Sequence, residues 1–259
     1  MMTCNRRPLV WKTLVFALGL IGLCTQAFAE PGIGCQVKPA SASLADTQPA
    51  RLTDSYWLGR VSQQDHDLDR LDASKVRLLL LGDSIIEAWA PPVQQLFYGH
   101  RSMLNLGVGG DNTQGLLWRI GRLRLTNLRP KLVVLLIGTN NVWPGKAPED
   151  VAAGVAEVVR QIRDWTPQSR ILMLGLLPRG AVNTDPVRAI AQQVNTIIAR
   201  CADGVSVFYS DPGMLLIDSS GRLPDWAAPD HLHPDWISYG ILAAALEPQI
   251  RRLLGEAAN

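Results

Sequence analysis

Five short apolar runs recur along the chain, and most are followed by a segment with helical spacing. Continuous apolar runs of this length are typical of strands that are buried on both faces. The runs cover residues 76–81, 102–106, 131–137, 170–176 and 204–209. The helical patterns cover residues 54–72, 85–96 with a break at Pro91-Pro92, 112–123, 148–164, 185–201 and 234–254.

This alternation predicts an α/β fold, because parallel strands need crossover connections and helices are the usual ones. We expect a three-layer α/β/α sandwich around a five-stranded parallel sheet. The flavodoxin-like strand order 2-1-3-4-5 is our prediction for the sheet. The segment 54–72 is polar with interspersed apolar residues, so we expect it to pack on the sheet edge.

The first 29 residues have the pattern of a secretory signal peptide. Arg6 and Arg7 form a positive start, residues 14–24 are apolar, and Ala27-Phe28-Ala29 is a small-x-small cleavage site. The apolar run is shorter than the about 20 residues that a bilayer span needs, although an uncleaved anchor is the alternative. We therefore expect a periplasmic or secreted protein that meets the membrane only through this segment.

Residues 30–50 are rich in Pro, Ala, Ser and Gly and lack periodicity, which predicts a flexible linker or arm. Residues 51–259 are long enough for a single domain with one sizeable core. After residue 29 the chain keeps two cysteines, Cys35 and Cys201. Export makes a disulfide between them permissible, but the sequence leaves their pairing open.

The charge pattern does not suggest a nucleic-acid partner. The formal net charge is +2, yet residues 1–29 hold three basic residues and no acidic one, so the remainder carries −1. Arg119, Arg122 and Arg124 are spaced like the solvated face of a helix. The oligomeric state stays open, a homodimer included.

Chemistry-bearing residues collect in four segments that follow strands or lie near the end of the chain. In the expected fold these segments meet at one edge of the sheet. They are Gly82-Asp83-Ser84, residues 107–113, residues 138–141 and residues 230–234.

Ser84 follows a strand and a tight turn, and a helix begins after it. This arrangement can expose a nucleophilic hydroxyl, but a serine at this position can equally be the helix N-cap. Asp230 and His233 stand three residues apart, so one helical turn would make them neighbours, with the carboxylate orienting His233 as a base. His231 is the less suitable base. A zinc site built on His231 and His233 is the competing interpretation, but only His66 and His100 remain as further histidine ligands, in polar or turn segments, and we expect no metal.

The glycine-rich segment 107–113 matches neither a dinucleotide fingerprint nor a P-loop, which argues against nucleotide binding. Gly110 precedes a helix and can offer its N–H to an oxyanion, or it can simply supply the positive φ that a turn requires. Asn140 follows the most apolar strand and carries an amide donor, although Asn often caps the next segment.

Taken in order, Gly82-Asp83-Ser84, Gly110, Asn140 and Asp230-x-x-His233 resemble the four signature blocks of the SGNH (GDSL-type) hydrolases. Longer blocks are similar to the catalytic subunits of the platelet-activating-factor acetylhydrolase Ib type. The resemblance spans about residues 56–254. These longer blocks are residues 107–113 with Leu117-Trp118-Arg119, residues 138–141 and residues 175–180.

The resemblance implies the SGNH hydrolase fold and a serine esterase that works through an acyl-enzyme without metal or cofactor. Ser84 would be the nucleophile, His233 the base and Asp230 its orienting carboxylate. The oxyanion hole would comprise the Ser84 N–H, the Gly110 N–H and the Asn140 amide. Asp83 would be a structural residue of the turn.

We expect the substrate to be a small-molecule or glycan ester of a short acyl group, with acetyl as the first candidate. The alternatives are a lysophospholipase or thioesterase, a polysaccharide O-acyltransferase, and a non-catalytic carbohydrate-binding protein. Four tryptophans fall near the expected site in sequence, and their rings would suit sugar rings or acyl chains. We nevertheless expect most of them to lie in the core. They are Trp89, Trp143, Trp226 and Trp236.

Overall fold

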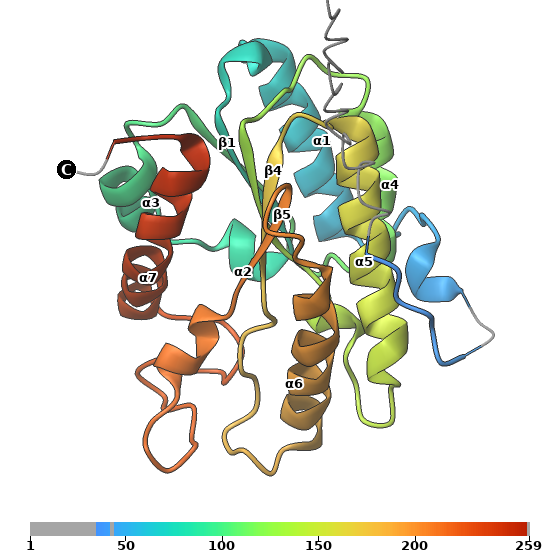
Figure 1. Cartoon of the computed structure of the whole chain (residues 1–259), viewed down its shortest axis with the longest axis vertical. Helices are drawn as coiled ribbons and strands as arrows, with labels where there is room; N and C mark the ends of the chain where they lie inside the picture. Colours follow the sequence, from blue (N-terminus) through green and yellow to red (C-terminus); the bar gives the residue numbers. More distant parts are fainter. Residues whose placement is uncertain (1–34, 42–43, 258–259) are drawn as a thin grey trace, which may run out of the picture. The chain divides into compact units, whose positions relative to one another are not determined.

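A five-stranded parallel sheet with the order β2-β1-β3-β4-β5 forms the centre of the fold (Figure 1). The computed structural model describes residues 35–41 and 44–257, so the predicted signal peptide and parts of the predicted arm lie outside the described residues. The fold class and the strand order are confirmed. The strands are β1 (Leu78–Gly82), β2 (Met103–Gly107), β3 (Leu132–Leu136), β4 (Arg170–Leu174) and β5 (Val207–Ser210).

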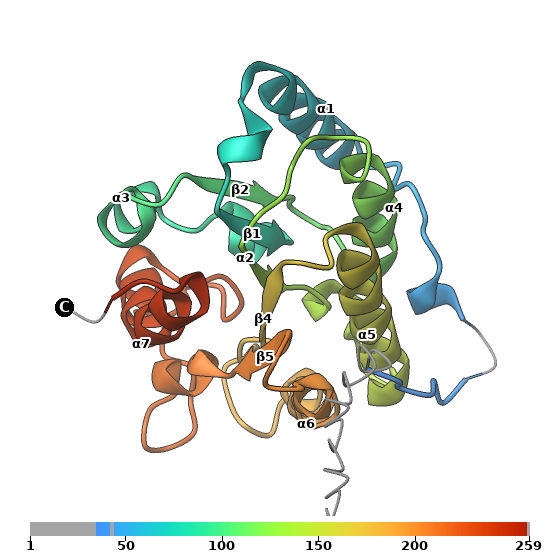
Figure 2. The ribbon, with the colours of Figure 1, turned by 45° about the horizontal axis from the view of Figure 1, so that its top comes forward.

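Helices cover both faces of this sheet (Figures 1 and 2). On one face α5 (Pro148–Trp165) packs between α4 (Thr113–Leu123) and α6 (Pro186–Ile198), and on the other α3 (Pro91–Tyr98) contacts α7 (Trp236–Leu254). The remaining elements are α1 (Ser55–Arg70), α2 (Ser84–Glu87), and the 3₁₀ turns η1 (Ala45–Thr47), η2 (Ala73–Lys75), η3 (Thr139–Asn141), η4 (Ala199–Cys201) and η5 (Pro212–Leu216).

The central strands are apolar throughout because both of their faces are covered. Every residue of β1 and β3 is buried, which explains why their sequences do not alternate between polar and apolar residues. Burial of each leucine or valine side chain contributes about 1.5–3 kcal/mol. At the sheet edge, Gln64 of α1 donates a 2.8 Å hydrogen bond to the carbonyl oxygen of Gly107 in β2, which agrees with the packing expected for residues 54–72.

Glycines allow the chain to pack closely where β1 and β2 end. A Cβ atom on Gly82 would lie 2.0 Å from the carbonyl oxygen of Leu136, and one on Gly107 would lie 2.1 Å from the backbone nitrogen of Glu87. Contacts this short are not tolerated between backbone and side-chain atoms. Gly107 therefore lets α2 lie against the carboxyl end of β2, and Gly82 lets the backbone of Leu136 at the end of β3 approach β1.

The expectation of a solvated arginine face on α4 is wrong for Arg119. This side chain is buried, and its guanidinium donates a 2.6 Å hydrogen bond to Asp111 Oδ2. Arg122, in contrast, is partly exposed and pairs with Asp65. The spacing could not separate the two because a buried carboxylate, which the pattern does not show, neutralises Arg119.

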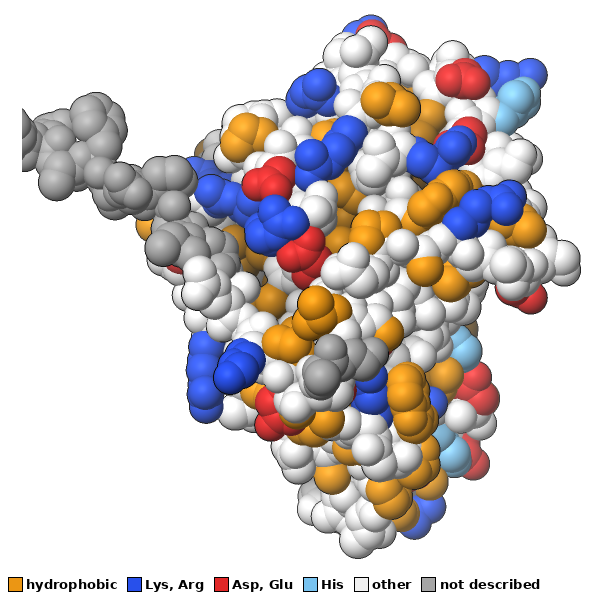
Figure 3. Space-filling model, turned by 90° about the vertical axis from the view of Figure 1, so that its right-hand side faces the viewer, with side chains coloured by type: hydrophobic (Ala, Val, Ile, Leu, Met, Phe, Trp, Pro, Cys, Tyr) orange, Lys and Arg blue, Asp and Glu red, His pale blue; other side chains and the backbone are white. Residues whose placement is uncertain are grey.

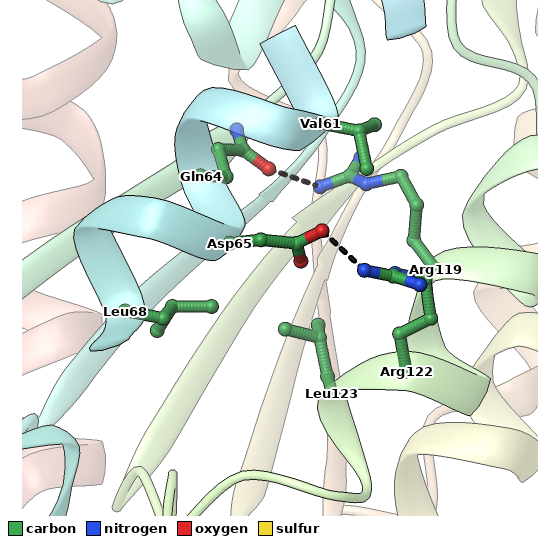
Figure 4. A pocket seen from close by; sticks show the side chains of 7 residues that line it. All are labelled: Val61, Gln64, Asp65, Leu68, Arg119, Arg122 and Leu123. Atoms are coloured by element: carbon green, nitrogen blue, oxygen red, sulfur yellow. Dashed lines mark hydrogen bonds and ion pairs between the residues drawn. The ribbon is translucent and has the colours of Figure 1, made fainter. Parts of the chain in front are cut away.

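A small pocket lies between α1 and α4 (Figure 4). Its polar groups pair with one another, since Arg119 contacts Gln64 and Arg122 contacts Asp65. We assign no ligand to it. The pocket is lined by Val61, Gln64, Asp65, Leu68, Arg119, Arg122 and Leu123.

A disulfide joins Cys35 to Cys201, with their Cα atoms 4.5 Å apart. The sequence left this pairing open. None of the helices in the described part of the chain is long and apolar enough to cross a membrane.

Candidate active site

Ser84 is the first residue of α2, and its hydroxyl is not used as a cap. The N-cap is Asp83, whose Oδ1 accepts a 2.9 Å hydrogen bond from the backbone N–H of Ile85. The Ser84 Oγ instead lies 2.9 Å from Nε2 of His233. The sequence left open whether Ser84 is a nucleophile or a helix N-cap. The capping role is filled by Asp83, not by Ser84.

His233 is held by Asp230 on its other side. Nδ1 of the ring lies 2.6 Å from Asp230 Oδ2, and Asp230 Oδ1 accepts hydrogen bonds from the backbone N–H groups of Leu232 at 3.0 Å and His233 at 2.8 Å. The sequence analysis expected Asp230 and His233 to be neighbours because one helical turn would bring them together. The two side chains are in contact, but they do not lie in a helix. Asp230 lies in a turn, residues 231–233 form a bend, and α7 begins only at Trp236.

The surroundings of Asp230 favour its charged form. Burial opposes ionisation, but the hydrogen bonds from the His233 ring and from the backbone of His233 and Leu232 outweigh it and lower the pKa of Asp230. An ionised carboxylate at Nδ1 keeps the proton on that nitrogen and leaves Nε2 as an acceptor. The Ser84 hydroxyl can then donate to Nε2.

Asp83 has the opposite environment. Burial raises the pKa of its carboxyl from 3.8 to about 7, although the hydrogen bond from Ile85 acts in the other direction. Its Oδ2 is buried and accepts no hydrogen bond from the described residues. These contacts make Asp83 a structural residue of the turn and give it no contact with His233 or Ser84 Oγ.

Gly110 and Asn140 follow β2 and β3, the two strands beside β1, and both lie beyond the carboxyl ends of these strands. Gly110 has φ of +74°, a conformation that favours glycine. The positive φ does not prevent the backbone N–H of Gly110 from donating a hydrogen bond. Asn140 lies in η3 and is exposed, and its Nδ2 donates a 2.7 Å hydrogen bond to the carbonyl oxygen of Asp111. The second hydrogen of this amide is left for another acceptor. Among the described residues, no acceptor is found for the backbone N–H of Ser84 or Gly110.

Two residues that the sequence analysis missed support these segments. Glu87 accepts hydrogen bonds from the Tyr56 hydroxyl and from the backbone N–H of Gly109. Arg179 donates a 2.7 Å hydrogen bond to the carbonyl oxygen of Thr139. The position of Glu87, one helical turn after Ser84, was the available signal. Arg179 lies in the similar block 175–180, but its role could not be assigned from the sequence because its partner is a backbone oxygen.

His231 does not contact Ser84. Its Nε2 lies 3.6 Å from Asp225 Oδ1, and its backbone has φ of +53°. Within the described ranges there is no group of three or more His, Cys, Asp or Glu side chains that could hold a metal ion.

The expectation that most of the four tryptophans lie in the core is wrong. Trp89 is buried, but Trp143, Trp226 and Trp236 have exposed fractions of 50%, 53% and 69%. Trp236 is exposed at the first residue of α7, where no earlier helical turn lies beside it. Trp226 and Trp236 flank the segment that carries Asp230 and His233.

This arrangement has the parts that acyl transfer requires. A hydroxyl, an imidazole and a carboxylate form one chain of hydrogen bonds, and N–H donors lie on the neighbouring loops. Such a chain can remove a proton from the hydroxyl during attack on a carbonyl carbon.

Comparisons with known proteins agree with this chemistry. The model of the GDSL-like lipase/acylhydrolase family matches residues 80–239. The chain is 32% identical over 183 residues to the human platelet-activating factor acetylhydrolase IB subunit alpha1, covering 69% of this chain and 77% of that protein.

Solved structures with low identity support the fold. A putative acylhydrolase from Bacteroides fragilis superposes with a TM-score of 0.62 at 22% identity, covering 78% of this chain and all of that one. A carbohydrate acetylesterase family member from Sinorhizobium meliloti has a TM-score of 0.55 at 16% identity, covering 70% and 99%.

Proposed function

Because this chain belongs to the GDSL-like lipase/acylhydrolase family and is a serine ester hydrolase, we propose that it removes short acyl groups, acetyl first, with a Ser84-His233-Asp230 triad. The observation that carries the proposal is the continuous chain of hydrogen bonds from Ser84 Oγ to His233 at 2.9 Å and from His233 to Asp230 at 2.6 Å.

In the first half of the reaction Ser84 Oγ attacks the ester carbonyl carbon and His233 Nε2 takes its proton. The tetrahedral intermediate collapses when the leaving alkoxide receives that proton from His233, and the acyl group stays on Ser84. Asp230 stabilises the imidazolium that forms between these two transfers. No metal or cofactor is needed in this sequence of steps.

Negative charge develops on the carbonyl oxygen during attack. The donors proposed for it are the backbone N–H groups of Ser84 and Gly110 and the second amide hydrogen of Asn140. The bond from Asn140 to the Asp111 carbonyl oxygen fixes the plane of that amide, so little reorganisation is needed. Each donor of this kind is worth roughly 3 kcal/mol in the transition state.

In the second half a water molecule takes the place of the alcohol. His233 accepts a proton from the water as it attacks the acyl carbon, and then returns a proton to Ser84 Oγ. The products are the free carboxylic acid and the original enzyme. A sugar hydroxyl in place of water would make the same acyl-enzyme an O-acyltransferase.

The choice of acetyl is supported by the name of the 32% identical relatives, which are acetylhydrolases of platelet-activating factor. A glycan as the alcohol part is supported by the exposed rings of Trp226 and Trp236 beside the triad segment, because aromatic faces suit sugar rings. The structural neighbour described as a carbohydrate acetylesterase agrees with this choice. A lipid ester is the second candidate, since the curated relatives carry a lipid in their name.

Export completes the proposal. The signal-like pattern of residues 1–29 and the disulfide between Cys35 and Cys201 support a periplasmic or secreted location, because disulfides persist mainly in oxidising compartments.

The test combines a fluorophosphonate probe, mapped by mass spectrometry, with a series of p-nitrophenyl esters of increasing acyl length and with acetyl-xylan. We expect the label on Ser84, the highest kcat/KM for acetyl, and release of acetate from the glycan. Preference for long chains would favour the lipid hydrolase, and transfer of acetyl to a sugar would favour the acyltransferase. Glycan binding without any label on Ser84 would overturn the enzyme assignment in favour of a carbohydrate-binding protein.

A further inference from the structure

The segment before α1 is tied to the rest of the fold at several points. We call residues 35–50 the strap, which is described at 35–41 and 44–50. It starts at the disulfide to Cys201, its Ser41 N–H donates to Asp150 Oδ1 at 3.0 Å, and its Ala50 N–H donates to the carbonyl oxygen of Gln114 at 3.0 Å. The strap runs beside α5 and α4 (Figures 1 and 2), on the face where Figure 3 shows basic, acidic and apolar side chains mixed together.

Asp46 is the strap residue that reaches the site loops. Its side chain has an exposed fraction of 5%. Oδ1 accepts hydrogen bonds from Asn141 Nδ2 and Gln114 Nε2, both at 3.0 Å, and Oδ2 lies 2.5 Å from Lys146 Nζ. Its backbone oxygen accepts a 2.8 Å hydrogen bond from the Thr113 hydroxyl. The Asp46 carboxylate is therefore buried and surrounded by three donors, unlike a solvated surface charge.

The partners of Asp46 stand next to the proposed oxyanion donors. Asn141 follows Asn140 directly, and its Oδ1 accepts a 3.0 Å hydrogen bond from the backbone N–H of Thr113. Thr113 begins α4, three residues after Gly110. The Asn141–Thr113 bond therefore joins the loop of Asn140 to the loop of Gly110, and Asp46 binds both of its members.

We propose that Asp46 is a positioning residue of the oxyanion hole, which sets the spacing between Gly110 and Asn140 through Asn141 and Thr113. The inference rests on the proposed function, because it requires those two groups to be the donors. Without the carboxylate, the amides of Asn141 and Gln114 and the ammonium of Lys146 lose a common acceptor. The donors must lie close to the position of the oxyanion. A shift of the two loops therefore reduces the stabilisation of the transition state more than it reduces the affinity for the substrate.

Gly154 of α5 gives an independent way to disturb the strap. A Cβ atom at this position would lie 2.7 Å from the backbone oxygen of Asp46 and 2.7 Å from Thr113 Oγ1. The backbone oxygen cannot rotate away, so Gly154→Ala disturbs the contact between Asp46 and Thr113 while the Asp46 carboxylate remains. Gly154→Ala and the substitutions of Asp46 should therefore change the kinetic constants in the same direction.

The experiment measures kcat, KM and the rate of fluorophosphonate labelling for Asp46→Ala, Asp46→Asn and Gly154→Ala, on p-nitrophenyl acetate and below the melting temperature of each variant. We expect kcat and the labelling rate to fall about tenfold or more in the alanine variants, with KM changed less than about twofold. Asp46→Asn keeps one acceptor oxygen, so it should lose less than Asp46→Ala. Asp164→Ala, which removes an exposed carboxylate of α5, is the matched control and should leave kcat unchanged.

An unchanged kcat in folded Asp46→Asn and Gly154→Ala would overturn the inference, as would a fall that only tracks the unfolded fraction. Ser84→Ala separates this result from a failure of the proposed function. If Ser84→Ala keeps its activity, the proposed function fails. If Ser84→Ala is inactive and the strap variants are fully active, only the role of Asp46 fails.

Discussion

The carboxylate of Glu87 accepts a 2.5 Å hydrogen bond from the backbone N–H of Gly109. The two residues follow different strands, β1 and β2. Glu87 also accepts from the Tyr56 hydroxyl at 2.9 Å and lies 2.7 Å from Arg60 Nε. One side chain thus joins the helix that begins with Ser84, the loop that carries Gly110, and α1.

Glu87→Ala is predicted to lower the free energy of unfolding by about 1–3 kcal/mol, because it leaves a backbone donor without its acceptor. It should also lower kcat by roughly tenfold, since the loop next to Gly109 is released. Urea denaturation and steady-state kinetics measure the two effects. Glu149→Ala removes an exposed glutamate and should change stability by less than about 0.5 kcal/mol. Equal stability of the two variants would contradict the role given to Glu87.

Asn140→Ala is predicted to lower kcat by about two to three orders of magnitude with little change in KM, because its amide is proposed to act only in the transition state. Steady-state kinetics with p-nitrophenyl acetate check this, and circular dichroism checks the fold. A fall in kcat of less than about fivefold, roughly 1 kcal/mol by the rate equation, would remove Asn140 from the oxyanion hole.

His233→Ala is predicted to lower kcat by about four to six orders of magnitude, and Asp230→Asn by about four. The asparagine would favour the wrong tautomer of the ring. His231→Asn is the matched control, because asparagine tolerates the positive φ of residue 231 and the side chain lies away from Ser84. A large loss in His231→Asn with the fold intact would show that the base was assigned to the wrong histidine.

Asp83 is predicted to make stability depend on pH. Burial raises the pKa of its carboxyl to about 7 in the folded protein, against 3.8 as the ordinary value. Below about pH 4 both states are protonated, and between about pH 4 and 7 only the unfolded chain releases the proton. Its contribution to stability is therefore full at low pH and is lost as the pH rises towards 7, with at most about 1.4 kcal/mol per pH unit.

Urea denaturation of Asp83→Asn across that range tests this linkage. The asparagine side chain keeps an acceptor for the Ile85 N–H but cannot ionise, so the curve of stability against pH should be flatter than that of the unmodified protein. Parallel curves would mean that Asp83 does not titrate in this window.

Loss of the Cys35–Cys201 disulfide is predicted to lower the free energy of unfolding by about 2–5 kcal/mol, because it closes a loop with a sequence separation of 166 residues. Cys35→Ser and reduction of the unmodified protein should lower the melting temperature by similar amounts. A reductant should have no further effect on Cys35→Ser. An unchanged melting temperature after complete reduction would contradict the prediction.

The sheet was predictable because each strand is a continuous apolar run between turn residues, and such runs mean burial on both faces. The expected strand ends differ from the observed ones by only a few residues, as for residues 204–209 against β5 at Val207–Ser210. The strand order was reached by analogy with open α/β sheets. No pattern in the sequence shows directly which strands are neighbours in the sheet.

The candidate site was predictable as a set of residues but not as a geometry. Asp230 and His233 meet through hydrogen bonds to backbone N–H groups in a bend, which a spacing of three residues does not distinguish from a helix. Arg119 was misjudged because its partner Asp111 lies in a loop before the helix. Asp46 lies in the segment 30–50 that was predicted to be a flexible linker or arm, and its composition gives no sign of a buried carboxylate.

The cap of α2 belongs to Asp83, so the side chain at position 84 can be exchanged without unwinding the helix. A thiol introduced there by Ser84→Cys would still face the imidazole of His233. Thioesters formed on such a thiol would be a route to hold the acyl group in place for crystallography. The natural acyl group could then be seen directly, carried by the protein that selected it.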